Sequence, residues 1–120
     1  MAKLPYKTSA IFWLGDSLET LSGFPKPTKR RLGFAIRQVQ NGLTPEIAFP
    51  LTGLGGGVYE LKTDGGGDTF RVVYIVKLSK GLYVLDAFKK KSKSGKAIPR
   101  EIANRLKLRA REARDYDKRN

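Results

Sequence analysis

The residues best suited to chemistry on a phosphate lie in a predicted β-hairpin. Residues 70–76 and 82–85 are rich in β-branched and aromatic side chains, and the stretch Ser79-Lys80-Gly81 between them indicates a turn. Because side chains alternate between the two faces of a strand, the register decides which polar groups meet. A two-residue turn at Ser79-Lys80 or Lys80-Gly81 would place on one face Arg71, Val73, Ile75, Lys77, Leu82, Val84, Asp86, Phe88 and Lys90. A three-residue turn would move Arg71 to the opposite face.

A third strand, predicted at residues 58–63, brings two more charged side chains to the same face. If its last residue pairs with Phe70 across the glycine-rich turn that follows, Lys62 lies directly opposite Arg71, and Glu60 joins them. The alternative is that these charges only decorate a solvated sheet face.

The charge balance predicts a polyanionic partner. The 120 residues hold 24 lysines and arginines against 11 acidic residues, a net charge of +13, and residues 89–120 alone contribute 13 basic and 4 acidic residues. Nucleic acid is the first candidate, and a solvated basic face is the alternative. Phe88 could stack on an unpaired nucleobase, a contact worth ~1–3 kcal/mol, or cap the edge of the core. The predicted RNA-binding residues are Phe88, Lys89, Lys91, Lys93, Lys107 and Arg111.

Two missing residue types narrow the chemistry. The chain has no cysteine and no histidine, which excludes disulfides and thiolate catalysis and removes the commonest zinc ligand and acid–base residue. We therefore expect no metal or cofactor, with any catalysis carried by Lys, Arg, Tyr, Asp or Glu. No apolar run is long enough for a signal peptide or a membrane span, so we expect a cytoplasmic protein without membrane contact.

The N-terminal half predicts a strand, two helices and a loop. The strand is expected at Thr8–Leu14, and a short helix follows, in which Asp16 and Glu19 have the spacing of a capping box. Residues 28–41 repeat apolar side chains at helical spacing. Residues 44–57 are rich in proline and glycine, and we expect a loop there.

The C-terminal segment predicts a third helix that completes one α+β domain over residues 1–120. Pro99 stands where proline is tolerated at a helix start, and an apolar stripe over residues 102–113 is expected to dock on the sheet. Arg100, Lys107, Arg111 and Arg114 form a separate basic stripe, with Arg105 and Arg109 expected elsewhere on the exposed surface. The predicted fold has two helices before an antiparallel sheet of about four strands and one helix after it.

Four stretches occur in an order that is typical of one toxin family. They read VYELK at 58–62, FRVVY at 70–74, YVLDAFKKK at 83–91 and KAIPREI at 96–102. With these stretches the chain resembles the RelE/ParE toxin superfamily, specifically its HigB-like, phage-related branch. The resemblance extends over most of the chain and implies the same α+β layout.

The resemblance also implies an activity. Toxins of this type in type II toxin–antitoxin systems are ribosome-dependent mRNA endoribonucleases, or mRNA interferases, and a cognate helix-turn-helix antitoxin neutralises them. The matching catalytic positions are Lys62, Arg71, Phe88 and Lys90, with Lys89, Lys91 and Lys93 beside them. Where many relatives in this branch have histidine, this chain has Asp86.

The activity that the resemblance implies can be assigned to side chains without a metal. Attack of a ribose 2′-hydroxyl on the adjacent phosphorus requires one proton to be removed, extra phosphate charge to be stabilised and another proton to be donated. Arg71 could hold the phosphate through two hydrogen bonds, while Lys62 or Lys90 neutralises the developing charge. The base could be a lysine kept neutral by its cationic neighbours, or the carboxylate of Asp86 or Glu60.

Two other functions stay open. One is a ParE-like inhibitor of DNA gyrase, which cuts no RNA, although the lysine run disfavours it. The other is a non-catalytic nucleic-acid-binding module, which the missing histidine would favour.

Overall fold

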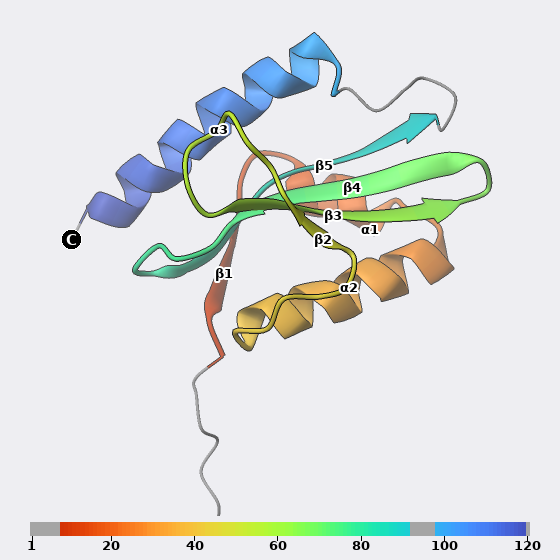
Figure 1. Ribbon diagram of the computed structural model, residues 1–120, viewed down its shortest axis with the longest axis horizontal. Helices are drawn as coiled ribbons and strands as arrows, with labels where there is room; N and C mark the ends of the chain where they lie inside the picture. Colours follow the sequence, from red (N-terminus) through yellow and green to blue (C-terminus); the bar gives the residue numbers. More distant parts are fainter. Residues whose placement is uncertain (1–7, 92–97, 120) are drawn as a thin grey trace, which may run out of the picture.

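The computed structural model describes residues 8–91 and 98–119, which form a five-stranded sheet covered by helices on both faces (Figure 1). In chain order the elements are β1 (Ala10–Trp13), α1 (Ser17–Ser22), α2 (Lys26–Gln40), β2 (Ala48–Pro50), β3 (Val58–Gly65), β4 (Asp68–Ile75), β5 (Gly81–Lys91) and α3 (Arg100–Lys118). The α+β fold with two N-terminal helices and one C-terminal helix is therefore confirmed.

The sheet differs from the predicted one in its edges. Its strand order is β1-β5-β4-β3-β2, and β1 runs parallel to β5 while the other neighbouring pairs are antiparallel. The described sheet is thus mixed and five-stranded, rather than antiparallel with about four strands. The extra strand, β2, lies inside the stretch that we predicted to be a loop.

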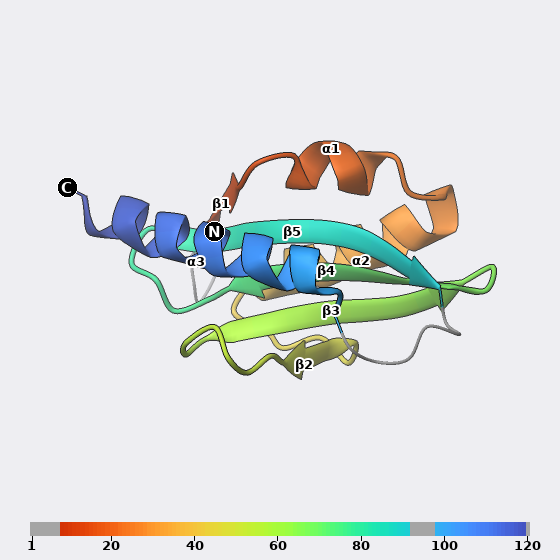
Figure 2. The same cartoon turned by 90° about the horizontal axis from the view of Figure 1, so that it is seen from above.

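Each face of the sheet packs on its own helix layer. Figure 1 shows α2 below the sheet, and Figure 2, which looks down on α3, shows α3 crossing over β4 and β5. The core under α2 is built from Leu21, Leu32, Ala35, Ile36, Val39, Leu61, Phe70, Val72, Tyr74, Leu82, Val84 and Ala87. The core under α3 is built from Val58, Val73, Ile75, Tyr83, Leu85, Phe88, Leu106, Ala110 and Ala113. We call the two sides of the sheet the α2 face and the α3 face.

The β3–β4 hairpin has the predicted register. Lys62 lies opposite Arg71, and Thr63 lies opposite Phe70. The turn residues Gly66 and Gly67 both have positive φ angles, 60° and 86°, which a tight hairpin turn of this kind requires. A slip of one residue would turn the buried apolar set of both strands toward the opposite face, so burial fixes this register.

The β4–β5 hairpin has a longer turn than predicted and a bulge. The connection spans residues 76–80, and the register shifts after the Val73–Asp86 pair, because Tyr74 lies opposite Val84 and leaves Leu85 as the extra residue. Beyond the bulge the two faces exchange, so Leu82 and Val84 belong to the α2 face. The prediction that these two share a face with Arg71 was wrong, whereas Asp86, Phe88 and Lys90 do share it.

The expected capping box at α1 is absent. Asp16 makes no side-chain cap and instead accepts a hydrogen bond from Arg109 Nη2 of α3 at 3.1 Å. This hydrogen bond lowers the pKa of the Asp16 carboxyl below its usual value, although partial burial opposes it. Asp16 thus binds α3 and does not cap the N-terminus of α1.

The C-terminal end of α3 is tied to the β4–β5 turn. The carboxylate of Asp117 accepts bonds from the backbone N–H groups of Ser79 and Lys80, both at 2.8 Å, and from the hydroxyl of Tyr83 at 3.0 Å. In return, Lys80 Nζ donates to the carbonyl oxygens of Tyr116, Asp117 and Arg119 at the end of the helix. Two opposite charges therefore hold the turn and the helix end together.

In the part of the chain that the structure describes, no helix is both long enough and apolar enough to cross a bilayer.

Candidate functional site

Three adjacent strands carry the predicted site on the α3 face. Lys62 of β3, Arg71 of β4 and Phe88 of β5 lie in one row across the sheet. Glu60 lies two residues before Lys62 on β3, and Lys90 lies two residues after Phe88 on β5, so alternation places both on this face. The geometry therefore brings Lys62, Arg71 and Lys90 to one face of the sheet, as the sequence indicates, with Arg71 and Lys90 buried there.

Arg71 is the most unusual polar residue of this row. Its side chain is buried, and Nη1 donates to Glu60 Oε1 at 3.2 Å. Its Nε has no hydrogen-bond partner, and it is the one such buried side-chain atom among the described residues. Nε and Nη2 share one edge of the guanidinium, and that edge matches two oxygens of a phosphate. The pairing with Glu60 leaves the buried Nε–H unsatisfied, and an oxyanion reaches it only when the side chains around it move.

Lys62, which lies opposite Arg71, contacts an aromatic residue on the edge strand β2. Its Nζ lies over the ring of Phe49, 5.2 Å from the ring centroid. Phe49 lies opposite Glu60, so its ring is on the α3 face, and the residue is 45% exposed. Sequence reasoning missed Phe49 because it stands in the predicted loop, and the only signal was a large aromatic residue two positions after Ile47.

The lysines that follow Phe88 divide between the two faces. Lys90 is buried on the α3 face, opposite Thr69. Lys89 lies opposite Phe70 and is exposed on the α2 face, where it lines a groove of about 910 Å³ together with Arg31. Lys89 therefore does not join Arg71. Lys91 ends β5 and is exposed, and the predicted RNA contact at Lys93 lies outside the described residues.

Asp86 is held by the C-terminal helix. Its Oδ2 accepts from Nε and Nη2 of Arg105, at 2.9 and 2.7 Å, and its Oδ1 accepts from Arg109 Nη1 at 3.1 Å and from the backbone N–H of Ala87 at 2.9 Å. The side chain is only 1% exposed. These bonds favour a structural role for Asp86 over that of a general base. They also show that the guanidinium groups of Arg105 and Arg109 both turn toward the sheet, although the Arg105 side chain stays 41% exposed.

Phe88 is a core residue. It is 5% exposed and packs in the α3 core with Leu106. Of the two roles that the sequence left open, burial favours the cap on the core edge over stacking on a nucleobase, because a base cannot reach a ring that α3 covers.

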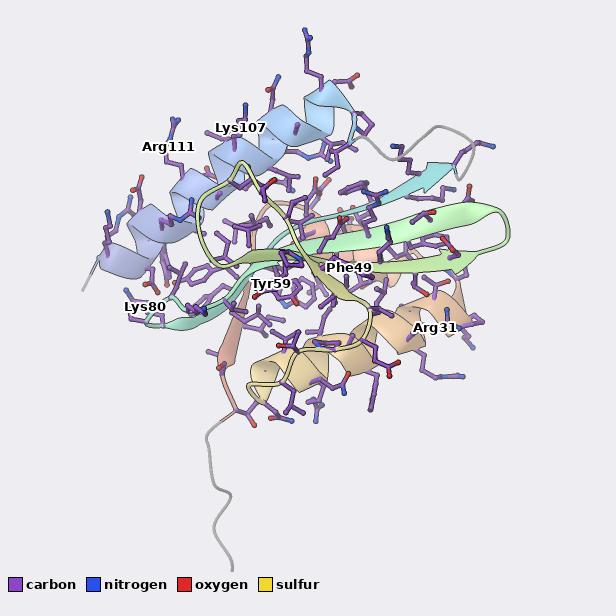
Figure 3. All side chains as sticks on the ribbon, in the orientation of Figure 1. Arg31, Phe49, Tyr59, Lys80, Lys107 and Arg111 are labelled. Carbon is purple, nitrogen blue, oxygen red and sulfur yellow. The ribbon has the colours of Figure 1, made fainter. Side chains whose placement is uncertain are left out.

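A basic groove lies between α3 and the loop that precedes β3. Figure 3 shows Lys107 and Arg111 on this helix, pointing away from the sheet, and both are exposed. They line a groove of about 370 Å³ with Gly53 and Leu54, and Arg114 Nη2 closes it by donating to the Leu54 carbonyl at 2.6 Å. The predicted basic stripe is therefore present, but Arg114 is partly used to hold the neighbouring loop.

The buried tyrosines lie away from this site. Tyr59 and Tyr74 stack on the α2 face with ring centroids 5.9 Å apart, and burial raises the pKa of the Tyr74 hydroxyl. Tyr83 is on the α3 face near the turn at residues 76–80, where burial and its bond to Asp117 raise its pKa to about 12. Neither hydroxyl is placed to exchange a proton beside Arg71.

No three acidic side chains within residues 8–91 and 98–119 converge as a metal site would require. The groups that the site offers are cations, one carboxylate and an aromatic ring, which can bind a phosphate with an attached base.

Comparison with known proteins identifies the family. The family model described as Phage derived protein Gp49-like (DUF891) matches residues 19–109, which is more than half of the chain and includes Phe49, Glu60, Lys62 and Arg71. No curated protein matches the chain. The chain therefore belongs to the Gp49-like family of phage-derived proteins, a family of the toxin type.

Proposed function

We propose that this protein is the toxin of a type II toxin–antitoxin system and that it cuts messenger RNA on the ribosome, as the HigB-like branch of the RelE/ParE superfamily does. Membership of a toxin-type, phage-derived family supports the toxin class. The observation that carries the ribonuclease is the buried guanidinium of Arg71, whose Nε–H has no partner, on the strand position directly opposite Lys62.

The proposed reaction needs no group beyond these side chains and the RNA. The 2′-oxygen forms a bond to phosphorus while the bond from phosphorus to the 5′-oxygen breaks, which leaves a cyclic phosphate and a 5′-hydroxyl. The Nε edge of Arg71 holds the phosphate oxygens, and Lys62 stabilises the charge that develops on them. Glu60, in contact with Arg71, takes the proton of the 2′-hydroxyl, and Lys90 protonates the leaving oxygen.

The sequence alone left the base open among a lysine, Asp86 and Glu60, and the proposal selects Glu60 and makes Lys90 the acid. Both oxygens of Asp86 are already bound by cations and an N–H group, so Asp86 receives no reacting role in the proposal. Glu60 is the carboxylate that remains on the face of Arg71.

Cleavage of ribosome-bound message by single-site variants tests the proposal. Arg71→Ala should lower the cleavage rate by about 10²–10³-fold, since it removes a preorganised donor to the phosphate. Arg71→Lys keeps the charge but loses the bidentate geometry, so its cleavage rate should stay close to that of Arg71→Ala. Arg37→Ala, an exposed arginine on α2, is the matched control and should cleave at the parental rate.

The outcome also separates the alternatives. Equal cleavage by the Arg71→Ala variant and the parent would remove the assignment of the site. Damaged DNA in expressing cells, with intact messages, would indicate a gyrase inhibitor. RNA binding without any cleavage would indicate a non-catalytic module.

The proposed partners follow from the proposed activity. The ribosome presents the message, and a helix-turn-helix antitoxin neutralises the toxin. Co-expression with the protein encoded by a neighbouring gene should restore growth to cells that produce the toxin.

A further inference from the structure

Phe49 has surroundings that set it apart from the other exposed apolar residues. The large apolar side chains at least 45% exposed in the described part of the chain are Leu18, Phe34, Leu43, Phe49, Leu108 and Tyr116. Of these, Phe49 alone is on a strand of the sheet, where it lies opposite Glu60. Its ring is thus on the same face as Arg71 and the proposed phosphate site.

Lys62 joins the ring to the phosphate site. Its Cα lies opposite Arg71, and its ammonium lies 5.2 Å from the centroid of the Phe49 ring. A nucleotide that places its phosphate between these two cations therefore brings its base, or that of its neighbour, next to the ring. In Figure 3, Phe49 lies on the β2 edge, away from Lys107 and Arg111 on α3.

The ring can offer stacking area that Phe88 cannot. Phe88 is 5% exposed, whereas Phe49 is 45% exposed. Every nucleobase has a π-face, so an aromatic platform binds single-stranded RNA with little dependence on its sequence. In the described sheet β2 is an edge strand, so no further strand lies beside Phe49 on its outer side.

We propose that Phe49 is the stacking platform for an unpaired nucleobase of the RNA whose phosphate Lys62 and Arg71 hold. This inference rests on the proposed function and adds to it that the substrate is single-stranded beside the scissile phosphate. Loss of the aromatic ring weakens binding by about 5- to 150-fold, the range that stacking on one side chain typically provides.

Fluorescence at position 49 tests the contact directly. Trp13 is the single tryptophan and lies on β1, the opposite edge of the sheet. In the double variant Trp13→Phe/Phe49→Trp, a single-stranded oligodeoxynucleotide, which has no 2′-hydroxyl and is not cut, should quench the emission at saturating concentration. The control Trp13→Phe/Phe34→Trp reports from α2, on the other face, and should not be quenched.

Affinity for two probes separates stacking from charge. Phe49→Ala should weaken binding of the base-containing oligonucleotide about 5- to 150-fold and leave binding of an abasic strand of the same length unchanged. Phe49→Leu keeps the apolar volume without the π-face and should behave as the alanine variant does, whereas Phe49→Tyr should bind as the parent does. Thermal melting of each variant verifies that the fold persists.

Some results would overturn the inference. Equal loss of affinity for both probes, no loss for either, or quenching that is the same at positions 34 and 49 would each do so. The proposed function can fail separately: quenching at position 49 in a protein that cuts no RNA keeps the platform and removes the ribonuclease. Cleavage that needs Arg71 but not Phe49, with no quenching, keeps the ribonuclease and removes the platform.

Discussion

Replacing Asp86 by alanine tests whether this carboxylate holds the fold or takes part in the reaction. Asp86 is 1% exposed and neutralises two arginines of α3. The substitution leaves Arg109, whose side chain is only 13% exposed, without its buried counter-charge. Removing one partner of a buried ion pair costs about 3–5 kcal/mol, because the other charge stays in a poorly solvated place.

The structure places the expected loss near the lower end of that range. Arg105 is 41% exposed and can turn its guanidinium to water, and Arg109 keeps its bonds to Asp16 and to the Leu85 carbonyl. We therefore expect Asp86→Ala to lower the free energy of unfolding by about 3 kcal/mol. In a domain of this size that loss corresponds to a fall in Tm of roughly 10 °C.

Urea unfolding, followed by circular dichroism, measures the change in free energy, and cleavage is assayed well below the new Tm. Asp115→Ala removes an exposed acidic residue of the same helix and should change stability by less than about 0.5 kcal/mol. If Asp86→Ala unfolds at the parental urea concentration but no longer cleaves, Asp86 acts in the reaction, and the structural assignment is wrong.

Three further predictions concern other charged groups. Burial raises the pKa of Asp117, but hydrogen bonds from Lys80, Ser79 and Tyr83 outweigh it and lower that pKa to about 2. The carboxylate therefore stabilises the fold above the usual value of 3.8, and this stabilisation is lost as the pH falls from about 4 toward 2. Thermal melts over this range should show the loss, and Asp117→Asn should remove that part of the pH dependence. Replacing Lys107 and Arg111 by alanine should reduce the slope of log affinity against log salt for a single-stranded oligonucleotide by about 1.4, and an unchanged slope would mean that the stripe contacts a protein instead. The double variant Glu60→Met/Arg71→Met should be at least as stable as the parent in urea, because apolar side chains replace a buried ion pair with an unsatisfied donor. The variant should cleave no RNA. A large loss of stability would mean that the ion pair stabilises the fold.

Apolar pattern was sufficient to predict the helices and the β3–β4 register. In that hairpin, one register alone buries Leu61 with Val72 and leaves the glycines at the turn, so sequence and burial agree. The β4–β5 hairpin was predicted less well, because a bulge changes the alternation without a characteristic residue. The extra residue, Leu85, and Asp86 both face α3, which simple alternation does not allow.

Two features of the site depend on contacts that are distant in the sequence. Strand β2 is three residues long and contains Pro50, so its strand propensity is low, and only pairing with β3 places Phe49 beside Lys62. Arg105 and Arg109 lie four residues apart on α3 and both bind Asp86, an acidic residue within an apolar strand. The sequence shows that Asp86 needs cationic partners, but the partners can be identified only from the docking of α3 on β5.

The charged residues of the α3 face differ in how completely the fold satisfies their hydrogen-bonding groups. Asp86 has both oxygens bound, so the fold accounts for it completely. Arg71 has one bond to Glu60 and a buried Nε without a partner, and a buried donor of this kind costs about 1–3 kcal/mol. Hydrophobic residues in its place would pack the strand at a lower cost, so the stability of the fold gives no reason for a guanidinium there. A ligand that brings oxygens to the Nε edge does give one, because its binding satisfies the donor that folding leaves open.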